Sequence, residues 1–160
     1  MLIRPPRDDD MDALIELGSD LHRESAYSFL PYESSKVRAL IGEYLDDQTY
    51  RCGLVAESAG TLVGMIGGIL IEYYFCHEKL VTDEVLFVRS DHRGGWAAHR
   101  LVSALQVWAV QQDAREICLS VSTNVNPAVA RRLYEGLGFE PVGGVFRKRL
   151  SSSAVAPRRR

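Results

Sequence analysis

The stretch of this chain best suited to chemistry runs from Val88 to Ala98, where a strand-like pattern gives way to a helical one. Residues 80–88 are rich in β-branched and aromatic residues, which favours a strand. Beyond the stretch, apolar residues recur at helical spacing, which indicates a helix with one buried face. These residues are Ala98, Leu101, Leu105 and Trp108, with Val102 and Ala109 beside them.

A junction of this kind can bind an anion. The N–H groups of a helix's first turn have no partner within the helix, and with the positive end of the helix dipole they attract negative charge. Arg93 adds a guanidinium, and four small neighbours would let a phosphate approach: Gly94, Gly95, Ala97 and Ala98. The stretch therefore predicts a diphosphate site, with the alternative that Gly94 and Gly95 only form a turn.

The segments that must hold this turn alternate between strand and helix patterns. Asn126 and Pro127 suit a helix N-cap and first residue, and Gly138 suits its C-terminal cap. Three glycines inside one predicted strand indicate a bulge or a close backbone approach: Gly64, Gly67 and Gly68. We expect strands at 2–4, 53–57, 62–73, 80–88, 116–122, 139–142 and 145–150, and helices after 10, over 33–45, from 98 and from 127.

Composition limits the class of protein. A chain of 160 residues with a formal charge of −2 has no broad basic field, so it does not suggest a nucleic-acid partner. We expect one domain over residues 1–150 and a disordered polar tail over residues 151–160. The three cysteines have no paired spacing, which favours reduced thiols in a cytoplasm over disulfides or a zinc site. No apolar run approaches the ~20 residues of a membrane span, so no membrane partner is expected.

Two segments resemble signatures of the GNAT superfamily of N-acetyltransferases. The acyl-CoA motif of that family reads Arg or Gln, two residues, Gly, one residue, then Gly or Ala. Arg93 and Ala98 fit it, whereas Trp96 stands in the place of the central Gly. The second segment reads Ala-x-x-Leu-Tyr-Glu-x-x-Gly-Phe, and every named residue is present from Ala130 to Phe139.

The resemblance implies an α/β (α+β) fold of the GNAT type. Its central sheet is mixed and mostly antiparallel, with about six or seven strands, a parallel splayed pair in the middle, and about four flanking helices. The order of the predicted elements is compatible with this fold.

The resemblance also implies an activity: transfer of an acetyl group from acetyl-CoA to a primary amine of a small molecule or a protein, by direct attack in a ternary complex and without a metal. The alternative is a non-catalytic acyl-CoA-binding or regulatory domain of the same fold. A Rossmann-type nucleotide binder would carry its glycines after the first strand, and here they follow the fourth. The implied acetyl-CoA-binding residues are Leu86, Phe87 and Val88 through the main chain, then Arg93, Gly94, Gly95, Trp96, Ala97 and Ala98, and Asn126, which is either a contact or only a cap.

Two residues are the implied catalysts. Tyr134 would protonate the leaving thiolate, unless it is only an aromatic packed in the core. Glu84 would accept the amine proton; it lies four residues before Val88 and hence on the same strand face by period two, whereas Asp83 would face the opposite way. The alternative for Glu84 is a solvated strand carboxylate.

The sequence leaves the acceptor open among small amines, antibiotics, polyamines and protein N-termini, and it leaves a homodimer open. Aromatic residues in two predicted loops suggest an aromatic-lined mouth for the acceptor: Tyr27, Tyr32, Tyr73, Tyr74 and Phe75.

Overall fold

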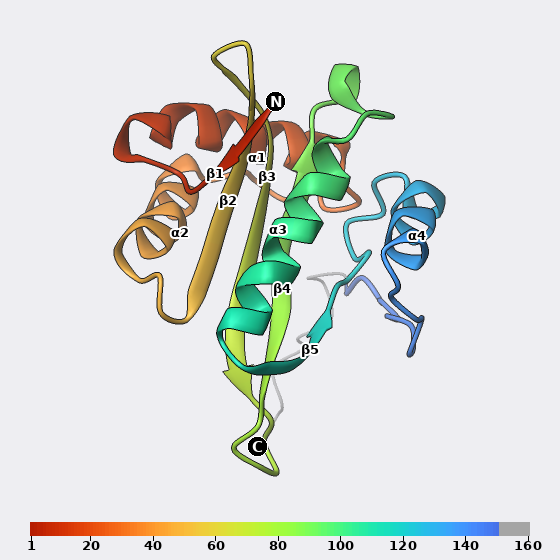
Figure 1. The fold of residues 1–160 in the computed structure, drawn as a ribbon. Coiled ribbons are helices and arrows are strands. Elements are labelled where there is room, and N and C mark those ends of the chain that lie inside the picture. Colours follow the sequence, from red (N-terminus) through yellow and green to blue (C-terminus); the bar gives the residue numbers. More distant parts are fainter. Residues whose placement is uncertain (151–160) are drawn as a thin grey trace, which may run out of the picture.

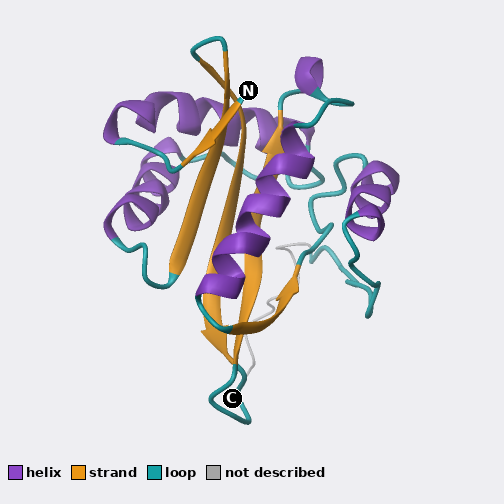
Figure 2. Ribbon diagram, in the orientation of Figure 1, coloured by secondary structure: helices purple, strands orange, loops and turns teal. Residues whose placement is uncertain are grey.

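The computed structural model describes residues 1–150, which form one five-stranded sheet with helices on both faces (Figure 1; Figure 2). The strands lie in chain order, and β4 and β5 are parallel while the other neighbouring pairs are antiparallel. They are β1 (Leu2–Arg4), β2 (Arg51–Ser58), β3 (Thr61–Glu72), β4 (Lys79–Val88) and β5 (Ala114–Cys118). The helices are α1 (Met11–Glu24), α2 (Ser34–Asp46), α3 (Ala97–Gln111) and α4 (Pro127–Gly136), with 3₁₀ turns at Asp8–Asp10 and Ser90–His92.

Helix α3 covers one face of the sheet, and α1 and α2 cover the other (Figure 1). The apolar stripe predicted for α3 is confirmed, since Leu101, Val102 and Leu105 are fully buried against the sheet. On the opposite face, Leu14 and Leu17 of α1 form a second buried cluster, with Val55, Leu62 and Phe87 of the strands. The sheet is therefore buried on both sides, and its exposed functional groups must lie at an edge or a gap.

A bulge in β4 changes which of its side chains share a face. The β3–β4 register shifts between Gly67 and Gly68, which pair with Val85 and Asp83, so Glu84 is an extra residue on β4. The irregularity expected at these glycines is confirmed, but the inserted residue lies on β4 rather than on the glycine strand β3.

The regular alternation of side chains between the two faces of the sheet is broken at this bulge in β4. Val81 and Val88 both pack in the core beneath α3 although they are seven positions apart, and an odd spacing on one face requires an inserted residue. The prediction that Glu84 shares the face of Val88 is therefore wrong. Its carboxylate instead contacts Tyr44 of α2 and Arg51 of β2.

Strands β4 and β5 separate halfway along β4. Their parallel ladder begins at Lys79 and ends at the pair Thr82–Cys118, while β4 continues for six more residues. Just beyond the last pair, the Asp83 carboxylate accepts the Ser120 N–H at 2.9 Å, so a side chain of β4 holds the start of the diverging segment. The splayed parallel pair implied by the resemblance is confirmed.

Two expectations about the sheet are wrong. The described part of the chain has five strands rather than six or seven, and the parallel pair lies at an edge of the sheet rather than in its middle. The missing strands are those expected at 139–142 and 145–150, where the backbone makes no ladder.

Residues 139–150 extend instead toward the loop after α1. The guanidiniums of Arg147 and Arg149 lie over the rings of Tyr27 and Phe29, at 4.9 and 4.0 Å from their centroids. Val142 and Phe146 are more than nine-tenths exposed, so they lack the buried face that would hold a strand on the sheet. The tail predicted over residues 151–160 lies outside the described residues.

Among residues 1–150, no helix is both long and apolar enough to cross a membrane.

Candidate active site

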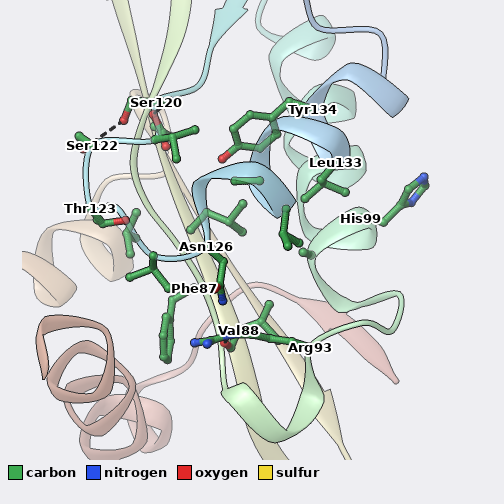
Figure 3. A pocket seen from close by; sticks show the side chains of 18 of the residues that line it. Phe87, Val88, Arg93, His99, Ser120, Ser122, Thr123, Asn126, Leu133 and Tyr134 are labelled. Atoms are coloured by element: carbon green, nitrogen blue, oxygen red, sulfur yellow. Dashed lines mark hydrogen bonds between the residues drawn. The ribbon is translucent and has the colours of Figure 1, made fainter. Parts of the chain in front are cut away.

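The gap between β4 and β5 opens into a cavity of about 500 Å³, here called the splay cavity (Figure 3). One wall is the last six residues of β4, and the other comprises the segment after β5 and the inner side of α4. The turn before α3 closes one end of the cavity. The lining includes Asp83, Glu84, Val85, Leu86, Phe87, Val88, His92, Arg93, Gly94, Gly95, Ala98, His99, Ser120, Asn126, Leu133 and Tyr134.

The turn before α3 has the geometry expected of an anion site. Gly94 adopts a positive φ of 82°, which a side chain would strain, and α3 begins three residues later with no side chain capping its N-terminus. Gly94, Gly95 and Ala98 line the splay cavity. Trp96 and Ala97 do not: Trp96 is 67% exposed with its indole against His99, and Ala97 is buried in the core.

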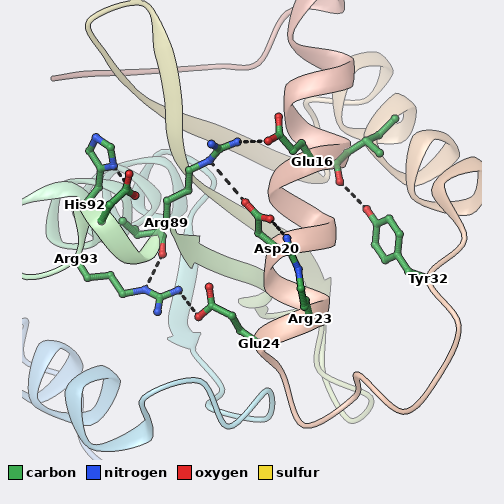
Figure 4. A network of polar contacts seen from close by, with 11 residues as sticks. Glu16, Asp20, Arg23, Glu24, Tyr32, Arg89, His92 and Arg93 are labelled. Carbon is green, nitrogen blue, oxygen red and sulfur yellow. Dashed lines mark hydrogen bonds and ion pairs between the residues drawn. The ribbon is translucent and has the colours of Figure 1, made fainter.

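Arg93 is held by protein groups at the edge of this turn (Figure 4). Its Nε donates to the Val88 carbonyl at 2.8 Å, and its Nη2 lies 2.7 Å from the Glu24 carboxylate of α1. The guanidinium also lies 5.3 Å from the centroid of the Phe87 ring. The cation predicted to meet a diphosphate is therefore already paired, although Arg93 lines the cavity.

A second arginine ties the same loop to α1. Arg89 lies 3.1 Å from the Glu16 carboxylate and 3.8 Å from that of Asp20 (Figure 4). With Glu24, these acids recur every four residues and hence share one face of α1. This face of α1 positions the loop that carries the anion site.

Beyond Thr82, the outer edge of β4 makes no ladder with any described segment, so its backbone groups face the splay cavity. Leu86, Phe87 and Val88 lie there, as the resemblance implied. The Phe87 ring is buried against α1, so this residue can meet a ligand in the cavity only through its main chain.

Tyr134 is fixed by the end of α4 with its hydroxyl directed into the splay cavity (Figure 3). Gly138 adopts a φ of 87°, as expected of a C-terminal cap, and the next N–H, of Phe139, donates to the Tyr134 carbonyl at 3.0 Å. The ring centroids of Tyr134 and Phe139 lie 5.9 Å apart, and Tyr134 is only 8% exposed. The residue is thus packed in the core and still presents its phenol to the cavity.

The environment keeps this phenol protonated. Burial raises the pKa of Tyr134 well above its ordinary value, and the negative charge of Asp83 raises it further. A phenol in this state carries the proton that a general acid needs, although a raised pKa makes that proton harder to give up.

Asn126 lines the splay cavity at the start of α4. It adopts a left-handed conformation, φ 45°, and Pro127 is the first residue of the helix, as expected. Asn126 is the N-cap residue of α4, as predicted, but its side chain makes no capping hydrogen bond. The carboxamide is directed into the cavity (Figure 3).

Asp83 is a site residue that the sequence analysis missed. It lines the splay cavity, where burial raises the pKa of its carboxyl while the donors of Ser120 oppose that shift. The signal was present in Gly67 and Gly68: an extra residue on β4 opposite them reverses the faces of Asp83 and Glu84 relative to Val88.

Glu84 lies at the bulge, and its carboxylate Oε2 accepts the Tyr44 hydroxyl at 2.6 Å and an Arg51 N–H at 2.9 Å. About a third of the Glu84 side chain, 31%, is exposed. In residues 1–150, no group of three His, Cys, Asp or Glu side chains is placed to hold a metal ion.

Comparisons with known proteins agree with this geometry. The family model described as the acetyltransferase (GNAT) family matches residues 15–139. Human N-acetyltransferase 8 is 35% identical over 95 residues, which are 59% of this chain and 41% of that protein. N-acetyltransferase family 8 member 3 of the mouse is 31% identical over 106 residues, 66% of this chain and 46% of that protein. The chain thus spans less than half of the length of these curated relatives.

Solved structures show the same fold. An aminoglycoside N-acetyltransferase in complex with CoA superimposes with a TM-score of 0.75 at 20% identity, covering 93% of each chain. A ribosomal-protein-alanine N-acetyltransferase from Brucella melitensis superimposes with a TM-score of 0.70 at 18% identity, covering 94% of this chain and all of that one.

Proposed function

The chain belongs to the acetyltransferase (GNAT) family, and on that premise we propose that it transfers an acetyl group from acetyl-CoA to a primary amine by direct attack in a ternary complex. The observation that carries the proposal is the splay cavity, where a helix N-terminus with small residues, an unpaired strand edge and the Tyr134 hydroxyl lie together.

Acetyl-CoA would bind along this cavity as substrate. Its diphosphate would rest on the amides of Gly94, Gly95 and the first turn of α3, and the amides of its pantetheine arm would pair with the β4 edge at Leu86 to Val88. A backbone N–H near Val88, aimed at the thioester oxygen, would stabilise the charge that develops there; comparable donors contribute ~3–4 kcal/mol.

The chemistry needs two proton transfers. The amine nitrogen attacks the thioester carbon, a C–N bond forms and the C–S bond breaks. Glu84 accepts the proton that the amine loses, directly or through a water, and Tyr134 gives its proton to the leaving thiolate. Solvent then returns a proton to Tyr134 and removes one from Glu84.

A non-catalytic acyl-CoA-binding domain would be favoured if Glu84 and Tyr134 faced only the core. Both line the splay cavity, so we place catalysis first. The test is a screen of primary amines with acetyl-CoA, with released CoA detected by a thiol reagent and acetyl-CoA affinity measured by calorimetry. Acetylation of at least one amine supports the proposal; tight acetyl-CoA binding without acetylation of any amine class would indicate the non-catalytic domain.

A further inference from the structure

A second cavity, here called the helix cavity, lies on the other face of the sheet between α1, α2 and the strands, with a volume of about 250 Å³. This volume is just below the roughly 300–1,000 Å³ of common ligand pockets, so the helix cavity suits a small chemical group. Leu40 of α2 is 38% exposed at its rim. Tyr32 lies against α1 at its wall, with its hydroxyl donating to the Ile15 carbonyl at 2.8 Å (Figure 4).

The helix cavity and the splay cavity meet at the β4 bulge. Glu84 and Val85 are the two residues that line both. A molecule in the helix cavity therefore reaches β4 at the bulge, from the face opposite to α3. An acceptor amine that gives its proton to Glu84 must approach β4 at this bulge.

The walls of the helix cavity are apolar. Side chains of α1 and α2 face those of the sheet across it, among them Leu14, Leu21, Val37, Ile41, Val55 and Met65. A polar group placed between these walls would lose its water without gaining a hydrogen bond, which is costly. Only an apolar group can occupy the space favourably.

At the β4 bulge, Glu84 lines the helix cavity, and the charged groups around Glu84 carry excess negative charge. Arg51 is shared by two carboxylates, Glu43 at 2.5 Å and Glu84 at 2.9 Å, so the three groups sum to about one negative charge. The Tyr44 phenol beside them stays protonated, because burial and the Glu84 carboxylate both raise its pKa. An ammonium arriving at Glu84 would balance this charge.

We infer that the helix cavity holds the body of the acceptor, and that the acceptor is a small primary amine with an aliphatic or aromatic group. The apolar group lies between α1 and α2, and the amine nitrogen lies at Glu84. This inference rests on the proposed acetyl transfer, and it disfavours polyamines, amino sugars and protein N-termini as acceptors.

The experiment is a series of linear alkylamines from ethylamine to octylamine, with acetyl-CoA and a thiol reagent. Each methylene that enters the cavity should raise kcat/KM about fourfold, the equivalent of ~0.8 kcal/mol, until the cavity is full. 1,5-Diaminopentane, which is close in length to hexylamine but carries a second ammonium, should react at least tenfold more slowly. A flat series, or a diamine that equals hexylamine, overturns the inference.

Two variants locate the effect in the cavity. Val37→Phe fills space between α1 and α2, so the rise in kcat/KM should stop at a shorter amine. Ala39→Phe adds the same ring to an exposed position of α2 outside the lining, and it should leave the series unchanged. If Val37→Phe does not fold, Leu40→Trp at the rim replaces it. Identical series in wild type and in the filled variant overturn the inference.

Calorimetry separates failure of this inference from failure of the proposed function. Hexylamine binding to the CoA-bound protein, weakened in Val37→Phe and unchanged in Ala39→Phe, supports the cavity assignment even if no acetylation occurs. Acetylation of amines without the length series leaves the transferase and removes the cavity assignment.

Discussion

The splay cavity and the helix cavity share the β4 bulge but are built from different parts of the chain. The splay cavity presents backbone: a helix N-terminus, a glycine turn and an unpaired strand edge. The helix cavity presents side chains from two helices and three strands. A ligand whose chemistry never varies, such as the CoA portion of the donor, can be held by backbone groups that any sequence supplies. A ligand that varies between enzymes must be selected by side chains.

The largest effect is expected from removing the Tyr134 hydroxyl, the side-chain group of the splay cavity that is proposed to take part in the chemistry. Tyr134→Phe should lower kcat by ~10²–10⁴-fold, the usual contribution of a positioned proton donor, with acetyl-CoA affinity unchanged. Steady-state kinetics and calorimetry measure the two quantities. Tyr50→Phe, at an exposed tyrosine outside both cavities, is the matched control. Wild-type turnover in Tyr134→Phe would make this residue a packing residue only.

The second prediction concerns Glu84, which lines both cavities. Glu84→Gln keeps an acceptor for the Tyr44 hydroxyl and removes the base, so kcat/KM should fall by about 10²-fold and lose its acidic limb. Glu43→Gln removes the other carboxylate on Arg51, which lines neither cavity, so its pH profile should keep that limb even though the lost charge weakens the attraction for an ammonium at Glu84. If wild type and Glu84→Gln show the same acidic limb, the proton goes elsewhere, for instance to bulk water from an amine already deprotonated.

The third prediction concerns charge at the anion turn. Arg93→Glu should weaken acetyl-CoA binding about tenfold, because a carboxylate replaces a cation beside the diphosphate; we take the lower part of the ~1.5–3 kcal/mol range for charged hydrogen bonds, since Glu24 already offsets Arg93. Arg100→Glu places the same charge change on an exposed residue of α3 outside the lining, and it should have a much smaller effect. Equal affinities in Arg93→Glu and wild type would contradict the assignment of the turn.

The same contrast between backbone and side chains explains what the sequence could predict. The elements from β1 to α4 and the anion turn follow from local patterns, and the structure has them in the predicted order. Leu86 to Val88 and Gly94 to Gly95 could be named because the fold places their backbone without regard to side chains. The helix cavity could not be predicted, since residues as distant as Leu14 and Val85 meet there only after folding.

The errors also have physical causes. A final hairpin was expected at residues 139–142 and 145–150, but a strand needs a sheet edge and a buried face, and neither is visible in a local pattern. Glu84 was assigned a face by period two, which one inserted residue reverses. Both failures concern pairing between segments rather than the preference of any one segment.

The smallest expected effect concerns Asp83, which joins the two strands where the splay begins. Asp83→Asn keeps an oxygen that can accept the Ser120 N–H, so the splay should persist, but it removes the negative charge facing Tyr134. Asp83 raises the pKa of Tyr134, and the protonated phenol is the active form, so activity is lost as the pH rises through that pKa. Without the charge, the pKa of Tyr134 should fall, and the basic limb of kcat should move to lower pH. The move should be partial, because burial is the larger cause of the raised pKa and remains.

The pH dependence of kcat for wild type and Asp83→Asn measures this shift. Asp91→Asn changes an exposed acid outside the lining of the splay cavity and serves as the control. A limb that stays in place in Asp83→Asn would show that the charge of Asp83 does not reach the proton that Tyr134 donates.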